Sequence, residues 1–245
     1  MTLDRNSKKD YLLAISIEEN QIIIYNSSFV PFQSIISSSP ANVMNVLLTG
    51  YLVVGFRNSS ICIYDQNSFG FVKELKHNAE IKGLLILPQT GELVSASIDG
   101  NILLWKPISF EKTTIQAIGN NLSQIALINN LEIISVASTN NSFQIFSKPP
   151  DSYTNTNNLT GHYDAVLDLA ILDNGFLASG SADSTIKLWD NTLKNVANVT
   201  SGSSGHVRSV LALNVLKNHN LVSTSEDRTA KIWLTDLYVN TKTFN

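Results

Sequence analysis

The chain contains a single cysteine, Cys62, among its 245 residues, and this excludes an internal disulfide framework. It lacks any run of about 18 apolar residues, the length of a membrane-spanning helix, and residues 1–10 lack the apolar core of a signal peptide. No long basic block accompanies the formal net charge of −3, so the footprint of a nucleic-acid-binding protein is missing. We therefore expect a cytoplasmic or nuclear protein that binds neither membranes nor nucleic acids.

Helical periodicity is absent as well, and in its place the chain shows a repeat of about forty residues. Short apolar segments such as Ile186–Trp189 end in an aromatic residue, and these residues follow one another at intervals of 39, 41, 41, 43 and 44 positions. They are Tyr25, Tyr64, Trp105, Phe146, Trp189 and Trp233. A fixed period of this size indicates stacked supersecondary units rather than one unique core.

The repeat around residues 162–189 shows how each unit is built. The apolar run Val166–Leu172 and the small-residue run Phe176–Ser181 predict two strands joined by a turn. A second turn leads to a third strand, Thr185–Trp189, and residues 193–200 can supply a fourth. Short strands with frequent turns are typical of a sandwich, barrel or propeller, and the self-similarity favours an all-β propeller.

This pattern predicts a single domain over residues 1–245, a β-propeller of about six four-stranded blades. The approximate blade ranges are 1–36, 41–76, 77–117, 120–160, 161–200 and 205–245. The first blade is the weakest, because its first strand would have to be the short, partly charged segment Met1–Arg5.

Several motifs resemble those of the WD-repeat (tryptophan–aspartate repeat) family of β-propellers. They are the Gly161-His162 and Gly205-His206 pairs, the small-residue strand with its turn aspartate (residues 177–183), and the closing segment Ile186–Asp190. Two repeats match closely, and a third matches through His77, Ser95, Ser97, Asp99 and Trp105. The other three match in spacing and strand pattern only.

The resemblance implies a structural network in which a loop histidine, a strand serine, a turn aspartate and a strand tryptophan are joined by hydrogen bonds. The implied sets are His77, Asp99 and Trp105; His162, Asp183 and Trp189; and His206, Asp227 and Trp233. In the three weak repeats Glu19, Asn58 and Asn140 stand six positions before the aromatic residue, and none of these repeats has a histidine at the matching loop. The network is thus lost as a whole, as expected if a half-satisfied buried network is costly.

Many propellers of this family have seven blades and close the ring with strands from both termini. Here residues 237–244 can form the outer strand of the last blade, and the N-terminus shows no spare strand to complete it. We expect either a six-bladed ring closed by side-chain packing or an incomplete seven-bladed ring. An open ring would expose apolar faces and strand edges, so a blade-completing partner is a further expectation.

Catalytic and metal sites find little support in the sequence. The His–Ser–Asp sets resemble triads, but they recur three times, whereas an active site is built once. The three network histidines lie more than forty residues apart, with no cysteines at ligand spacing, so we expect neither a metal nor a cofactor. His219 lies in a predicted turn and Cys62 on a predicted strand, where we expect a solvated and a packing residue.

We therefore expect a non-catalytic scaffold or complex subunit that binds other proteins or peptides through loops held by a rigid frame. Family geometry places the loop before the first strand and the turn between the second and third strands on one face. The candidate partner-binding residues on that face are Arg57, Glu80, Ile98, Tyr163, Asp164, Arg208, Glu226 and Arg228. Which face binds stays open at this point.

Two other functions remain as alternatives. A ubiquitin ligase-type adaptor would read acidic or phosphorylated peptides and would need an arginine cluster, for which Arg57, Arg208 and Arg228 are candidates. An enzymatic propeller would place catalytic residues in a central channel, and no convergent set of carboxylates is visible.

Overall fold

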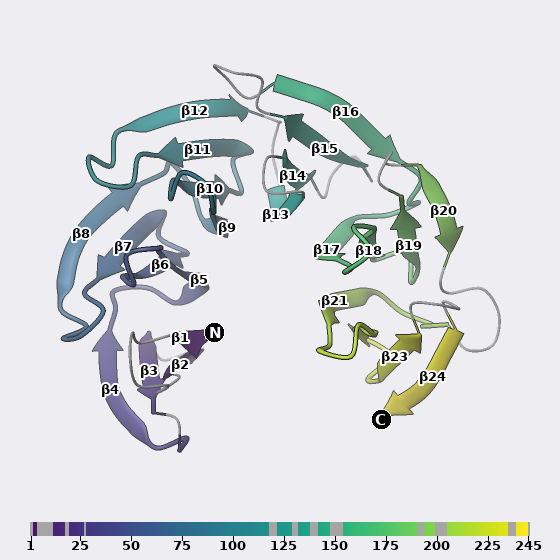
Figure 1. Cartoon of the computed structure of the whole chain (residues 1–245), viewed down its shortest axis with the longest axis horizontal. Coiled ribbons are helices and arrows are strands. Elements are labelled where there is room, and N and C mark those ends of the chain that lie inside the picture. Colours follow the sequence, from purple (N-terminus) through teal and green to yellow (C-terminus); the bar gives the residue numbers. More distant parts are fainter. Residues whose placement is uncertain are drawn as a thin grey trace. The chain divides into compact units, whose positions relative to one another are not determined.

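The computed structural model describes residues 2–3, 12–17, 20–26, 28–117, 122–128, 132–137, 142–147, 154–190, 194–198, 205–234 and 239–244. The chain divides into two compact units, Met1–Ala117 and Ile118–Asn245. Each unit holds three four-stranded antiparallel sheets whose strands pair in chain order (Figure 1). The described residues form no helix, and so none that is long and apolar enough to cross a membrane.

The first unit contains the first three sheets. The first sheet is β1 (Thr2–Leu3), β2 (Leu12–Ile17), β3 (Gln21–Tyr25) and β4 (Pro31–Ile36). The second sheet is β5 (Ala41–Val46), β6 (Leu52–Phe56), β7 (Ser60–Tyr64) and β8 (Phe71–Lys76). The third sheet is β9 (Ile81–Ile86), β10 (Leu93–Ser97), β11 (Asn101–Trp105) and β12 (Lys112–Ala117).

The second unit contains the remaining three. The fourth sheet is β13 (Leu122–Ile128), β14 (Glu132–Ala137), β15 (Ser142–Ser147) and β16 (Thr154–Thr160). The fifth sheet is β17 (Val166–Ile171), β18 (Leu177–Ser181), β19 (Ile186–Trp189) and β20 (Asn195–Asn198). The sixth sheet is β21 (Val210–Val215), β22 (Leu221–Ser225), β23 (Ala230–Leu234) and β24 (Val239–Phe244).

Every sheet lies within one of the six repeat ranges read from the sequence. The prediction of an all-β fold built from four-stranded propeller blades is confirmed. The single domain over residues 1–245, and its ring of six blades or an incomplete seven, stay predictions.

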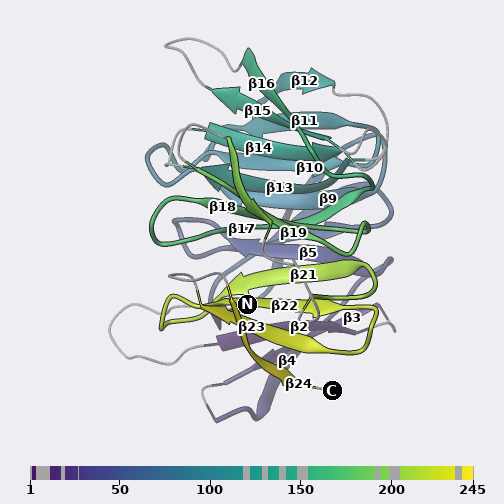
Figure 2. The same ribbon diagram turned by 90° about the vertical axis from the view of Figure 1, so that its right-hand side faces the viewer.

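In the second, third and fifth sheets the second strand is fully buried. Every residue of β6, β10 and β18 is buried, because sheets pack on both of its faces. In Figure 2 the neighbouring strands β17 and β21 of the second unit run side by side. A Cβ on Gly55 would lie 2.6 Å from Ile81 Cγ2, and one on Gly180 would lie 2.8 Å from Val210 Cγ1. Only glycine therefore lets the next sheet approach so closely.

Polar side chains join neighbouring sheets at their first strands. In the second unit Asp168 Oδ2 on β17 accepts the backbone N–H of Leu213 on β21 at 2.7 Å. In the first unit Asn45 Nδ2 on β5 donates to the Leu84 carbonyl on β9 at 3.1 Å. These bonds fix the height of one sheet against the next.

A repeated aromatic contact joins the sheets of the first unit at their outer strands. Phe69, in the turn before β8, packs edge-on against Phe32 of β4, with ring centroids 6.3 Å apart. Phe110, in the turn before β12, lies under Lys73 of β8, whose Nζ is 4.9 Å from the ring centroid. Phe29 has the same turn position in the first sheet, and it is 73% exposed.

Candidate partner-binding loops

In the fifth sheet a row of polar side chains ties the loop before β17 to the sheet. Trp189 Nε1–H donates to Ser179 Oγ at 2.8 Å, and the Ser179 hydroxyl donates to His162 Nε2 at 2.7 Å. His162 Nδ1–H then donates to Asp183 Oδ2 at 2.9 Å. Thr185 Oγ1–H donates to Asp183 Oδ1 at 2.6 Å. Each polar group of this row has a partner, as a stable buried network requires.

The sixth sheet repeats this arrangement. His206 bonds Ser223 Oγ at 2.7 Å and Asp227 Oδ2 at 2.8 Å, and Trp233 Nε1–H donates to Ser223 Oγ at 2.8 Å. Thr229 Oγ1–H holds Asp227 Oδ1 at 2.6 Å. The residues proposed for the networks of these two sheets are thus brought together by hydrogen bonds.

Burial decides the charge states in these rows. It lowers the pKa of His162 and His206, although the bonded aspartates act in the opposite direction, so both imidazoles are neutral near pH 7. Burial also raises the pKa of Asp183, but hydrogen bonds from Thr185, the Tyr163 backbone N–H and His162 outweigh this and hold it at about 2. Ser179 is 0% exposed. The set has the residue types of a catalytic triad without the access that a substrate needs.

The third sheet joins only part of its predicted set. His77 Nε2 and Trp105 Nε1 both meet Ser95 Oγ, at 2.6 and 2.7 Å. No hydrogen bond among the described residues joins His77 to Asp99, whose Oδ1 accepts the Asn101 backbone N–H at 2.9 Å. Asn101 stands where the other two sheets have a threonine, whose hydroxyl there lies within hydrogen-bond distance of both the carboxylate and the imidazole.

The serine that ends the second strand also differs between the third sheet and the fifth and sixth sheets. Ser181 Oγ–H donates to the Asp164 carbonyl at 3.0 Å, and Ser225 Oγ–H donates to the Arg208 carbonyl at 3.1 Å. Ser97 has the same register position in the third sheet, and its buried Oγ has no hydrogen-bond partner in the described part of the chain. The loop before β9 is therefore held less tightly than the loops before β17 and β21.

The weak repeat of the second sheet keeps the turn but has no histidine for the network. In the second sheet Asn58 Oδ1 accepts the Ser60 hydroxyl at 2.7 Å, as the turn aspartates accept a threonine hydroxyl. The equivalent Glu19 and Asn140 lie outside the described residues.

The residue after each network histidine faces solvent. The backbone N–H of Tyr163 donates to Asp183 Oδ2 at 2.9 Å, and that of Val207 donates to Asp227 Oδ2 at 3.2 Å. With the backbone fixed in this way, the Tyr163 side chain is 87% exposed and the Val207 side chain is 80% exposed. Val207 was missed by sequence reasoning, although its place directly after His206 was a usable signal.

The other second-unit candidates lie in the same loops and turns. The Ala182 N–H donates to the Ala165 carbonyl at 2.8 Å, and the Glu226 N–H donates to the Ser209 carbonyl at 3.0 Å, so each loop is bonded to the turn of its own sheet. The residues exposed there are Tyr163, Asp164, Val207, Arg208, Glu226 and Arg228, which we call the second-unit loop face. The ion pairs of the described residues include none of its four charged side chains.

Arg228 has a strained backbone. Its φ of 67° lies in the left-handed region, as do the φ values of Ser59 at 72° and Ser184 at 68° in the equivalent turns. The third sheet has Gly100 at this position, the residue that adopts such a conformation without strain. A long charged side chain at a position that favours glycine points to a role for that side chain outside folding.

The first-unit candidates are more engaged with their own structure. Glu80 Oε1 accepts hydrogen bonds from Asn42 and Lys82, and it lies 4.0 Å from Arg57 Nε. Burial raises the pKa of Glu80, but these donors outweigh it and leave the pKa below its ordinary value. Ile98 is half-buried. Glu80 therefore links the second and third sheets, and Arg57 is the exposed member of the three.

The remaining single residues behave as ordinary packing or surface groups. Cys62 is half-buried against the core of the first unit, and burial raises the pKa of its thiol. His219 is exposed and bonds the exposed Asp173 of the neighbouring turn. Within the described ranges no three His, Cys, Asp or Glu side chains are grouped to hold a metal ion.

A family model described as "WD domain, G-beta repeat" matches residues 153–190 and 198–233. The first match contains the histidine, serine, aspartate and tryptophan row of the fifth sheet, and the second contains the row of the sixth. The two sheets in which the network is complete are thus the two that the family model matches. Residues 153–190 and 198–233 are therefore WD repeats, and they support the WD-repeat family for this chain.

Proposed function

We propose that the chain is a non-catalytic scaffold that binds a protein or peptide through the second-unit loop face. WD40 domains in general bind other proteins or peptides and are non-catalytic. The observation that carries the proposal is the exposure of Tyr163 and Val207 on backbone that buried aspartates hold in place. An exposed aromatic or aliphatic side chain on a preorganised loop can enter a partner without a large loss of conformational entropy.

Charged residues of the same loops and turns form a polar rim for these two apolar side chains. Asp164 and Glu226 carry negative charge, and Arg208 and Arg228 carry positive charge, all on exposed positions. An apolar centre with a charged rim is the usual composition of a protein interface. Rim charges of both signs select partners more than they add affinity.

The test is affinity capture of tagged 1–245 from its native cells, with bound proteins identified by mass spectrometry. The variant Asp164→Ala with Arg208→Ala and Glu226→Ala is expected to fold normally and to lose the partners. Lys217→Ala with Asn218→Ala is the matched control, since both residues are exposed in the first turn of the sixth sheet. Partners retained by the triple variant, or lost equally with the control, would contradict the proposal.

A ubiquitin ligase-type adaptor is a narrower form of this function. Arg208 and Arg228 are both exposed on loops of the sixth sheet, and arginine is well suited to bind carboxylate or phosphate. Arg208→Glu would then abolish binding of acidic or phosphorylated peptides. Ligase subunits absent from the captured proteins would argue against this form and leave the scaffold function standing.

A blade-completing partner is a further proposal, which rests on the six repeat units of the sequence. If the ring is open, such a partner would cover the apolar face and the strand edge that an open ring exposes. Light scattering on purified 1–245 tests this, and a stable, monodisperse monomer would contradict it.

A further inference from the structure

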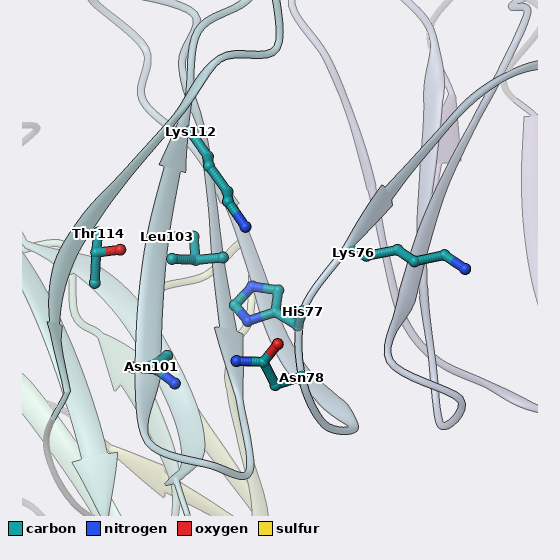
Figure 3. A pocket seen from close by; sticks show the side chains of 7 residues that line it. All are labelled: Lys76, His77, Asn78, Asn101, Leu103, Lys112 and Thr114. Carbon is teal, nitrogen blue, oxygen red and sulfur yellow. The ribbon is translucent and has the colours of Figure 1, made fainter.

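A polar cavity of about 120 Å³ opens on the third sheet, in the first unit (Figure 3). Its lining comes from the loop before β9 (His77, Asn78), from β11 (Asn101, Leu103) and from β12 (Lys112, Thr114). The side chain of Lys76, at the same rim, points away from the cavity in Figure 3 and lies 3.5 Å from Glu74. Lys112 instead points toward the His77 ring (Figure 3).

The buried imidazole of His77 directs an N–H donor to this space. Ser95 Oγ accepts the Trp105 indole N–H at 2.7 Å and lies 2.6 Å from His77 Nε2, where a hydroxyl can donate or accept. When the Ser95 hydroxyl donates to Nε2, the proton of the neutral ring lies on Nδ1. In the fifth and sixth sheets this N–H donates to an aspartate, but in the third sheet no described residue accepts it. The residue as a whole is 6% exposed, but Nδ1 is not among the buried side-chain atoms without a partner in the described residues, so solvent or a ligand in the cavity can reach it.

The neutral state of His77 agrees with this assignment. Burial, together with a smaller effect of the positive charge of Lys112, lowers its pKa to about 4 against the effect of Asp99. At pH 7 the cavity therefore presents an ammonium group and an imidazole N–H, and the Asn78 and Asn101 amides can each add donors.

The third sheet differs from the fifth and sixth in the strand that supplies the lysine near the network. Leu103 pairs with Ser95 in the register where Lys187 pairs with Ser179 and Lys231 with Ser223. Those two lysines are buried and occupied within their own sheets: Lys187 Nζ donates to Asn198 Oδ1 at 2.9 Å, and Lys231 Nζ donates to the Gly205 carbonyl at 2.7 Å. In the third sheet the lysine comes instead from β12 and reaches an open space.

We propose that this cavity binds a small oxyanion, a carboxylate or phosphate group, through Lys112 Nζ and His77 Nδ1–H. The volume equals that of about four water molecules at ~30 Å³ each, which is room for one such group. The cationic Lys112 and the His77 N–H converge on this space, and the Asn78, Asn101 and Thr114 side chains can each add a donor. Converging donors that include a charged one favour an anion with several acceptor oxygens. This site is separate from the second-unit loop face, and it does not rest on the proposed function.

The test is an NMR titration of protein labelled at histidine and tryptophan, with inorganic phosphate at pH 7 and constant ionic strength. The His77 ring and Trp105 indole signals should shift saturably. The network histidines and tryptophans of the fifth and sixth sheets are internal controls and should not shift. Equal shifts at all histidines, or none at His77, would overturn the proposal.

A charge-removing variant and its control make the test specific. Lys112→Gln should weaken phosphate binding about tenfold or more, where tenfold is ~1.4 kcal/mol. Lys106→Gln is the matched control, because this lysine of the same sheet is exposed and paired with Glu111 at 3.1 Å, and it should leave binding unchanged. Unchanged affinity in Lys112→Gln would overturn the proposal.

Acetate and a blocked phosphoserine peptide, titrated in parallel, identify where the oxyanion comes from. Tighter binding of the peptide than of inorganic phosphate would assign the site to a partner side chain. Equal binding of both would assign it to a free anion.

Discussion

Replacing Ser179 by alanine tests whether the buried network holds the fifth sheet together. The change removes the acceptor of the Trp189 indole N–H and the donor to His162 Nε2, and it leaves both groups buried. An orphaned buried group costs ~1–3 kcal/mol, so we expect the free energy of unfolding to fall by about 2–5 kcal/mol. Urea unfolding followed by far-UV circular dichroism measures this as a lower midpoint.

Ser97→Ala provides the matched control. Both serines are 0% exposed, but the Ser97 hydroxyl has no partner among the described residues, so its removal should change stability by less than about 0.5 kcal/mol or raise it. Combining Ser179→Ala with Trp189→Phe should recover part of the loss, because the orphaned indole N–H is removed as well. Equal effects of Ser179→Ala and Ser97→Ala would refute the reasoning.

Three further predictions concern acid stability, turn strain and sheet stacking. Burial lowers the pKa of His77 from 6.5 to about 4, so the stability that its neutral form contributes is complete above pH 6.5 and is lost as the pH falls toward 4. Urea midpoints measured at pH 7.5 and 4.5 check this, and equal midpoints would contradict it. Arg228→Gly should stay within about 1 kcal/mol of wild type in urea while partner capture falls, whereas Ser184→Gly, at the same backbone conformation, should leave capture unchanged. Gly55→Ala should destabilise by about 1–3 kcal/mol, because its Cβ would overlap Ile81; a thermal melt like that of wild type would show that the sheets can move apart.

The blades could be predicted from the sequence because the strands and turns of each blade are determined by residues within that blade. The run Phe176–Ser181 predicts a buried strand, and β18 forms there at Leu177–Ser181. The six-residue step from Asp183 to Trp189 spans one turn and one strand, and it recurs wherever that geometry recurs. Such signals depend only on neighbours within about forty residues.

The candidate site was harder to predict because its contacts cross between sheets. Glu80 was expected to be a partner-binding residue, yet its carboxylate accepts from Asn42 on β5, a strand of the preceding sheet. The spacing of residues along the chain does not predict which side chains of neighbouring sheets come into contact. Val207 looks like a core residue by type, and only the bond from its backbone to Asp227 turns the side chain to solvent.

The third sheet indicates where a WD-repeat chain can acquire added chemistry. It keeps the inner half of the network, from Trp105 through Ser95 to His77, and this half preserves the fold. It lacks the bond from the histidine to the turn aspartate, so His77 Nδ1 stays available to a ligand in the cavity. Asn101→Thr should therefore restore a hydroxyl bridge between His77 and Asp99, raise the urea midpoint, and weaken phosphate binding at the cavity. A variant that gains stability yet binds phosphate as tightly as wild type would show that the N–H of His77 is not the donor. In a complete network the histidine Nδ1–H is already bonded to the aspartate. A repeat without the histidine, such as that of Asn58, has no such N–H.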